Sequence, residues 1–421
     1  GGGANRALSS SSNGLEKRPK LRFPGFDEPW RESSFDELGS FYNGLSGKSK
    51  DDFGQGSDRF ITYMNVYKNT IATPDGCELV LVEDGEHQNR VEYGDILFTQ
   101  SSETLEEVGL SSVWLHKASP FLNSFCFGFH FAEKGMINPR FIAYSLRTSY
   151  MREKIIREGQ GATRYNLSSN RLKPIKLVYP SYQEQSRIAN LMSHLEKRIE
   201  KQQELICTLK KYKRGVIQHF FRHTDVRTES QQWQQVFLKD IFKKVSRRNT
   251  GALIKNVITN SAEYGLIPQR DFFDKDIAVE GNTENYYVIE NGDFVYNPRK
   301  SNTAPYGPFN RYTLKEQGII SPLYTCLVLK VDINPSYLAW YFKSDAWHRY
   351  IYDNGSQGVR HDRVSMTDDL LMGIPVIFPE RKIQDSIANT LDLIERKLHL
   401  AQSKLEMLNK EHKGFMQKLF I

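Results

Sequence analysis

The hydrophobic pattern is dominated by two segments in which apolar residues recur every seven positions. The first runs from Pro180 to Arg222 and the second from Pro379 to Ile421. Within each segment the apolar positions alternate at steps of four and three, which is typical of a coiled-coil seam. The pattern predicts two α-helices of about 40 residues, each about 60 Å long at 1.5 Å per residue. The predicted interface positions are Ile188, Met192, Leu195, Ile199, Ile206 and Leu209 in the first helix, and Ile387, Leu391, Ile394, Leu398, Leu405 and Leu408 in the second.

The two segments are copies of one another, and an offset of 199 residues aligns them without a gap. Glu196 falls on Glu395, and Lys213 falls on His412 as a polar seam position. Such a repeat predicts two similar halves, each a globular part followed by a long helix. The shared register favours antiparallel pairing of the two helices. The paired helices would hold the two halves apart, and the halves would be related by a pseudo-twofold axis. An alternative is that each apolar stripe packs on its own globular half.

The globular parts repeat the same order of motifs. Each has a Gly-Asp pair followed by a strand-like run, at Gly94 and Gly292, then an Asn-Pro pair that opens an amphipathic helix. A glycine-rich loop and a final strand follow in both halves. The fold class predicted is α+β, with two similar globular domains that are each followed by a long α-helix. The predicted divisions are a tail at 1–19, a first domain at 20–180, a central helix at 181–222, a second domain at 223–379 and a C-terminal helix at 380–421.

Composition narrows the class of protein without deciding it. The chain has 421 residues and a net charge of +7, a mild basic excess that fits nucleic acid but also many other proteins. Four widely spaced cysteines form no CxxC pair, which favours the cytoplasm. No apolar run approaches the roughly 20 residues of a membrane span. The Gly- and Ser-rich start is expected to be flexible or introduced by cloning.

Motifs for catalysis are missing from the sequence. The adenine-methyltransferase pattern [DNS]PP[YFW] is absent, as are FxGxG and HExxH. The string Gly47-Lys48-Ser49 resembles the end of a P-loop, but Tyr42 stands where that loop needs its first glycine. We therefore expect no catalytic residues and no metal site in this chain.

The order of motifs resembles that of type I restriction–modification specificity subunits (S subunits). The resemblance rests on KLRFPGF, on GDILFTQSSETLEEVGLSSV, on the INP helix followed by GQGATR, and on EQSRIA at the start of the long helix, with the arrangement duplicated. It covers the chain from about residue 20 to residue 421. It implies a non-catalytic subunit with two target recognition domains, each reading one half of a split, asymmetric site in double-stranded DNA.

The resemblance also implies partners and cofactors. Two methyltransferase subunits would dock on the paired helices, which set the spacer of the site, and restriction subunits would join the full complex. This chain would bind no cofactor itself. S-adenosylmethionine would belong to the methyltransferase subunits, where it supports adenine methylation, and ATP with Mg²⁺ to the restriction subunits.

Candidate DNA contacts are polar residues on loops, because base edges are read by Arg, Lys, Asn, Gln, Ser and Thr. The segment after the first Gly-Asp strand offers Thr99, Gln100, Ser101 and Ser102, although it could simply be a capped turn. The equivalent segment in the second half offers Asn297, Arg299 and Lys300, with Asn310, Arg311 and Tyr324 as neighbours suggested by the resemblance. The glycine loops add Arg164 and Arg360, and their glycines also suit helix C-caps.

Two other functions stay open at this point. One is the recognition half of a related restriction–methylation enzyme, in which a catalytic part is fused to recognition domains. The other is a coiled-coil adaptor that binds proteins without DNA specificity, for which salt-insensitive, weak DNA binding would be characteristic.

Overall fold

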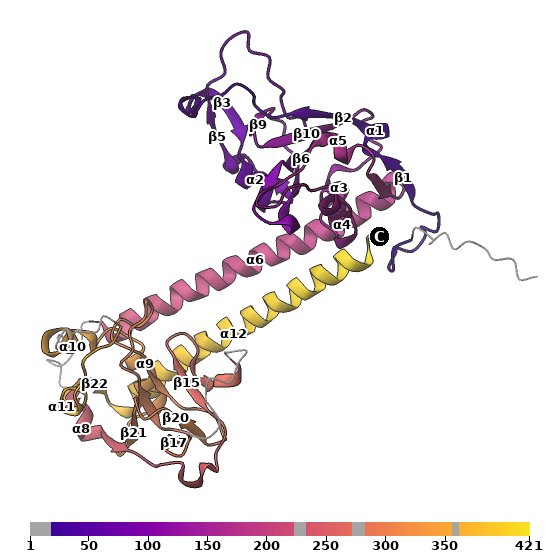
Figure 1. The fold of residues 1–421 in the computed structure, drawn as a ribbon. Helices are drawn as coiled ribbons and strands as arrows, with labels where there is room; N and C mark the ends of the chain where they lie inside the picture. Colours follow the sequence, from indigo (N-terminus) through magenta and orange to yellow (C-terminus); the bar gives the residue numbers. More distant parts are fainter. Residues whose placement is uncertain (1–17, 223–232, 272–282, 356–361) are drawn as a thin grey trace, which may run out of the picture. The chain divides into compact units, whose positions relative to one another are not determined.

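The computed structural model describes residues 18–222, 233–271, 283–355 and 362–421. The chain forms two compact units. Unit 1 comprises Gly1–Gln202 and Lys404–Ile421, and unit 2 comprises Gln203–Ser403. The two long helices α6 (Tyr182–Phe221) and α12 (Arg381–Lys418) each contribute residues to both units (Figure 1). The predicted α+β class with two long helices is confirmed.

Unit 1 is built around a five-stranded sheet of order β2-β10-β6-β8-β4, in which only the β4–β8 pair is parallel. Alternate residues of β6 face two apolar clusters, one containing Phe98 and the other Leu97, so the strand is buried on both faces. The strands of this sheet are β2 (Gly39–Asn43), β4 (Ile71–Ala72), β6 (Ile96–Thr99), β8 (Ser111–Trp114) and β10 (Cys126–Phe131).

Smaller elements surround the main sheet of unit 1. They are the pair β1 (Arg31–Ser34) and β12 (Lys176–Tyr179), the pair β7 (Ser101–Ser102) and β11 (Tyr165–Asn166), and the sheet of β3 (Phe53–Ile61), β5 (Cys77–Val80) and β9 (Phe121–Leu122). The helices are α1 (Phe35–Leu38), α2 (Tyr63–Lys68), α3 (Pro139–Ser145), α4 (Ser149–Arg157) and α5 (Ser169–Leu172).

Unit 2 repeats this plan with a four-stranded antiparallel sheet, β14-β21-β18-β19. Its strands are β14 (Phe242–Val245), β18 (Phe294–Tyr296), β19 (Phe309–Arg311) and β21 (Thr325–Leu329). Around it lie the pairs β13 (Trp233–Phe237) with β22 (Pro375–Pro379), β15 (Ile258–Ser261) with β16 (Gly265–Pro268), and β17 (Tyr287–Ile289) with β20 (Gly318–Ile320), and the helices α8 (Leu238–Ile241), α9 (Pro335–Phe342), α10 (His348–Asn354) and α11 (Asp368–Met372).

The Asn-Pro motif caps a helix in each unit and ties it to a long helix. The Asn138 side chain accepts hydrogen bonds from the first turn of α3, while its backbone N–H donates to Gln185 of α6 (2.7 Å). Asn334 does the same for α9 and donates to Gln384 of α12 (2.8 Å). The single amphipathic helix expected after each motif is instead two helices. In unit 1 the break falls at Thr148, whose hydroxyl caps α4.

Each unit contains an antiparallel contact between the long helices. In unit 1, His412 lies 3.8 Å from Glu196, and in unit 2, Lys213 donates to Glu395 (2.7 Å). These pairs are related by the 199-residue offset, so the same glutamate meets the same polar seam position in both halves. Helix-to-helix pairing is therefore found within each unit.

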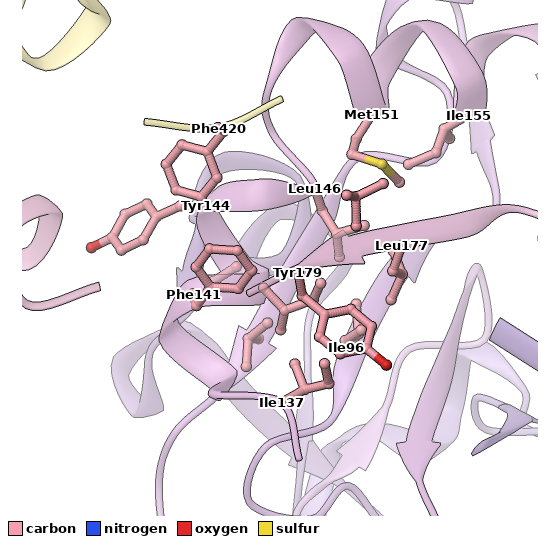
Figure 2. Close-up of a cluster of buried hydrophobic side chains, with 14 of the residues drawn as sticks. Ile96, Ile137, Phe141, Tyr144, Leu146, Met151, Ile155, Leu177, Tyr179 and Phe420 are labelled. Carbon is pink, nitrogen blue, oxygen red and sulfur yellow. The ribbon is translucent and has the colours of Figure 1, made fainter. Parts of the chain in front are cut away.

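The end of each long helix also completes the other half's core. In unit 1, Phe420 stacks on Phe141 of α3 with ring centroids 5.4 Å apart (Figure 2). In unit 2, Phe221 packs on Tyr337 of α9 at 5.5 Å. The first turns of each long helix belong to these same clusters: Ile188, Ala189, Met192 and Leu195 in unit 1, and Ile387, Ala388, Leu391 and Ile394 in unit 2. Packing on the globular half and pairing of the two long helices are therefore both present, at different positions along each helix.

Candidate nucleic-acid interface

In unit 1 the segment after β6 and the glycine loop lie side by side. They meet through the β7–β11 pair, in which Ser102 faces Tyr165 and Ser101 faces Asn166. Gln100 links the turn before β10 to the chain just beyond the glycine loop. Its N–H donates to the carbonyl of Phe125 (2.8 Å), and its carbonyl accepts from the N–H of Leu167 (2.8 Å). Two segments that are about 60 residues apart and that the sequence suggested separately therefore form one surface.

A cavity of about 390 Å³ opens at this surface. Its walls come from helix α2, the β6–β7 segment, the turn before β10 and the glycine loop. The lining residues are Tyr63, Met64, Tyr67, Ser101, Ser102, Glu103, Glu107, Phe125 and Arg164. The rings of Tyr63 and Tyr67 stack, and their hydroxyls donate to the carbonyl of Ser101 and to the Glu107 carboxylate. The bond from Tyr67 lowers the pKa of Glu107, while burial raises the pKa of Tyr63.

One half-buried arginine holds helix α2 in place beside the cavity. The guanidinium of Arg147 donates to the carbonyls of Val66, Tyr67 and Asn69 and, through Nε, to that of Ser111. Burial lowers the pKa of Arg147, but four carbonyl partners offset the loss of water. The cavity wall is therefore fixed to the main sheet.

Unit 2 has the same arrangement with a different set of side chains. The segment after β18 pairs with the chain beyond the glycine loop, since Arg299 faces Arg363 and the N–H of Val364 donates to the carbonyl of Pro298 (2.9 Å). A cavity of about 100 Å³ lies here, lined by Asn297, Pro298, Arg299, Leu323, Tyr324 and Arg363. The nearby Lys300 donates its N–H to the carbonyl of Asp362 (2.9 Å). This edge is richer in cations than its counterpart in unit 1.

Gly307 explains how the chain fits behind this edge. Its φ of +85° is in the left-handed region, and a Cβ there would lie 2.0 Å from the carbonyl oxygen of Asn297. Only glycine permits such a close approach. It keeps the segment carrying Arg299 against the loop that leads into β19.

Most of the predicted DNA-contacting residues lie at these two edges, with differing exposure. Gln100, Arg164 and Arg299 are exposed, and Ser101, Lys300 and Tyr324 are half-buried. Ser102 and Asn297 are buried within their turns, where their side chains accept from the backbone N–H of Thr104 and Arg299 respectively. Arg360 lies outside the described residues.

Three predicted residues have internal roles instead. Thr99 is fully buried, and its hydroxyl lies 3.4 Å from the carbonyl of Leu110. Asn310 is buried, and its amide donates to the Asn260 side chain (2.8 Å) and to a backbone carbonyl. Arg311 faces away from the Asn297 end of β18, because it pairs in register with Phe294 and donates to Ser336 (3.3 Å). The structure does not bring these three side chains to the exposed edges.

Both glycine loops also cap helices, as the alternative interpretation expected. Gly159 donates its N–H to the carbonyl of Ile156 (3.0 Å) after α4, and Gly355 donates to Ile351 (2.7 Å) after α10. In unit 1 the cap and the surface position coexist, because α4 ends at the loop that carries Arg164 to the cavity.

Sequence reasoning missed the apolar part of the interface. Tyr63, Met64 and Tyr67 come from a helix without a recognisable motif, and Phe125 lies in a turn that looks ordinary in sequence. Arg363 was overlooked in favour of Arg360 three residues earlier. The 199-residue offset that aligns the two long helices does not align these loops, so the sequence pattern gave no signal for these residues.

The described residues contain no group of three or more His, Cys, Asp and Glu side chains suited to a metal ion. None of the helices in the described ranges is long and apolar enough to cross a membrane.

The chain resembles known proteins in sequence and in fold. Residues 28–210 match the family model described as the type I restriction modification DNA specificity domain. The crystal structure of the type I restriction–modification system S subunit from M. genitalium is 16% identical, with 96% of this chain and 99% of that chain covered and a TM-score of 0.56. A structure from work on complex assembly and conformational transition of the type I R-M system is 13% identical, covers 94% and 98%, and has a TM-score of 0.54. Residues 28–210 therefore belong to the type I restriction modification DNA specificity domain family, and the chain as a whole has the fold of a type I restriction–modification specificity subunit.

Proposed function

We propose that this chain is the non-catalytic DNA-recognition subunit of a type I restriction–modification complex, and that each unit reads one half of a bipartite, asymmetric site. The observation that carries the proposal is the presence of two equivalent edges, at the ends of β6 and β18, with different side chains. Two similar folds that carry different side chains at their edges suit an asymmetric site. Arg299, Lys300 and Arg363 favour guanine contacts or phosphates in one half-site.

The proposal includes methyltransferase subunits that dock on the long helices. Helix α12 carries a second stripe at seven-residue spacing, Leu393, Leu400 and Met407, whose exposed fractions are 47%, 69% and 63%. The positions related by the repeat in α6 are His194, Lys201 and Thr208, so the stripe is a property of α12 alone. An exposed apolar stripe on a helix suits the apolar face of a partner helix.

The catalytic activities belong to the partners in this proposal. S-adenosylmethionine would bind the methyltransferase subunits, and ATP with Mg²⁺ the restriction subunits. The chain described here would determine which sequence of double-stranded DNA the complex binds, and it would set the spacing between the half-sites.

Methylation mapping tests the proposal directly. Cells that express this chain with its neighbouring methyltransferase gene would be sequenced for N6-methyladenine. We expect one split motif with a fixed spacer, methylated in both halves and lost when this chain is omitted. Absence of bipartite methylation with both proteins expressed would exclude the specificity role.

A further inference from the structure

The unit 1 cavity combines apolar and hydrogen-bonding groups that come from separate elements. Phe125, in the turn before β10, is 61% exposed, and Met64 of α2 is 47% exposed. Single exposed apolar residues are common on proteins. Here, however, two of them line one cavity together with the hydroxyl of Ser101 and the guanidinium of Arg164.

The Phe125 ring is exposed on a rigid backbone. The N–H of Phe125 donates to the Asn123 side chain (2.9 Å), and its carbonyl accepts from Gln100 (2.8 Å). The next residue, Cys126, begins strand β10 and is buried. The backbone is held on both sides in a turn that leaves the ring on the surface, where it is available to a ligand.

The polar side chains that line the cavity differ in whether their hydrogen-bonding groups already have partners. Tyr63 and Tyr67 direct their hydroxyls to partners within the domain. Within the described part of the chain, no hydrogen bond or ion pair engages the Arg164 guanidinium or the Ser101 hydroxyl. Arg164 and Ser101 therefore offer hydrogen-bond donors beside an apolar surface, on a wall that also carries Glu103 and Glu107.

A donor beside an apolar surface is complementary to the edge of thymine in the major groove. Thymine presents the O4 acceptor next to a C5-methyl group, whereas guanine presents two acceptors, and cytosine and adenine present amino donors without a methyl. We propose that unit 1 reads a thymine, with Phe125 and Met64 against the C5-methyl group and Arg164 or Ser101 donating to O4. This inference rests on the proposed DNA-recognition function and specifies one base of its target.

Unit 2 differs at the equivalent position. Leu323 is 66% exposed in the turn before β21, but its cavity is about 100 Å³ and is flanked by Arg299 and Arg363. Two guanidinium groups favour the paired acceptors of guanine. The thymine-reading role is therefore assigned to unit 1 only.

Removal of a single methyl group tests the inference. With the target known from methylation mapping, each thymine of the site would be replaced singly by deoxyuridine, which lacks the C5-methyl group. Binding of the complete complex with its methyltransferase subunits would be measured by fluorescence anisotropy at constant salt. We expect one substitution to weaken binding about fourfold, the value for burial of one methyl-sized group.

Variants connect that effect to the cavity. Phe125→Ala should bind the thymine and deoxyuridine duplexes equally, whereas Tyr93→Ala should keep the preference. Tyr93 is a matched control, since it is a 60% exposed aromatic residue of the same unit but lines a different cavity. Leu323→Ala in unit 2 should also retain the preference. Melting temperatures of the three variants would confirm that all are folded.

The failures are distinguishable. Equal binding at every deoxyuridine position, or a preference that survives in Phe125→Ala, would overturn the thymine assignment while leaving specific DNA binding intact. Equal binding to the target and to a scrambled duplex by the unaltered complex would instead overturn the DNA-recognition function on which the assignment rests.

Discussion

At the scale of single residues, asparagine side chains in unit 2 illustrate how a polar residue near the proposed DNA-binding edge can serve the fold instead. Asn260, Asn297 and Asn310 are all buried, and the Asn310 amide donates to Asn260 and to the carbonyl of Ser261. Removing a donor from a buried network leaves acceptors without partners, which costs about 1–3 kcal/mol per site.

We therefore predict that Asn310→Ala lowers the free energy of unfolding by about 1–3 kcal/mol. The exposed Arg299→Ala should change it by less than about 0.5 kcal/mol while weakening DNA binding. Chemical denaturation and DNA binding would be measured on both variants. Unchanged stability together with a binding loss in Asn310→Ala would show that Asn310 reads DNA after all.

The aspartate of the repeated Gly-Asp pair has different partners in the two units. Asp95 accepts from Tyr42 and bonds to the His130 ring (2.6 Å), whereas Asp293 pairs with the guanidinium of Arg247. The bond to Asp95 raises the pKa of His130 above 6.5, against a lowering by burial, and Glu92 adds to the rise while Lys134 opposes it.

A raised pKa means that the folded state binds the His130 proton more tightly than the unfolded state does. The associated stability is complete below about pH 6.5 and is lost as the pH rises through the folded-state pKa. We predict that thermal unfolding of unit 1 shifts to lower temperature between pH 6 and pH 8, and that His130→Gln reduces this shift. An identical shift in the variant would assign the pH dependence to other groups.

At the scale of elements, the ends of the long helices are core elements of the opposite halves. Phe420 in unit 1 and Phe221 in unit 2 are 4% and 1% exposed and occupy equivalent places in their clusters. Truncating a buried phenylalanine removes apolar contacts and leaves a cavity, at a cost of about 3–5 kcal/mol.

We predict that Phe420→Ala destabilises unit 1 and that Phe221→Ala destabilises unit 2, each by roughly this amount. Hydrogen exchange followed by mass spectrometry would locate the loss, with faster exchange in α3 for the first variant and in α9 for the second. The exposed Met407→Ala serves as the control. Faster exchange confined to the helix end itself would contradict the shared-core interpretation.

The apolar stripe on α12 gives a second prediction for this scale. Leu400→Glu should leave the fold intact, because the side chain is 69% exposed, but should abolish co-purification of the methyltransferase subunit. Gln402→Glu changes the charge equally two residues further on, on another face of the helix, and should have no effect. Full co-purification with Leu400→Glu would place the docking surface elsewhere.

At the scale of the whole molecule, the paired helices are proposed to set the spacer of the DNA site. Seven residues inserted at equivalent places, after Gln203 and after Gln402, preserve the seam and lengthen each helix by about 10 Å. We predict a spacer longer by up to about three base pairs, since these are 3.4 Å apart along a strand, with both half-sites unchanged. Methylation mapping would measure the spacer, and seven residues inserted at the exposed Gly85 turn would be the control. An unaltered spacer would contradict the ruler role.

The sequence predicted the parts of the fold that rest on periodic signals. The seven-residue repeat gave both long helices, the offset gave the duplicated plan, and the polar seam pair Lys213 and His412 indicated helix pairing. Gly-Asp and Asn-Pro placed strand β6 and helix α3 because caps and turns depend on nearby residues.

The composition of the candidate site was less accessible from sequence. The cavity in unit 1 gathers residues from four elements, and strand register decides which of them face it. Thr99 and Gln100 are neighbours in the chain, yet one is buried and the other exposed, because Thr99 is the last residue of β6, which is buried on both faces, and Gln100 lies just beyond it. Phe125 resembles a core residue by type, so its exposure could not be foreseen without the turn.

The discontinuous make-up of unit 1 has a consequence for biosynthesis. Its core requires residues of the segment 404–421, which are translated after every residue of unit 2. Domains generally fold as they are synthesised, the N-terminal part first. Here the half that is synthesised first is the last to complete its core. During translation the surface of α3 around Phe141 therefore stays uncovered until Phe420 has been made. A chaperone that binds nascent chains would accordingly bind the first half.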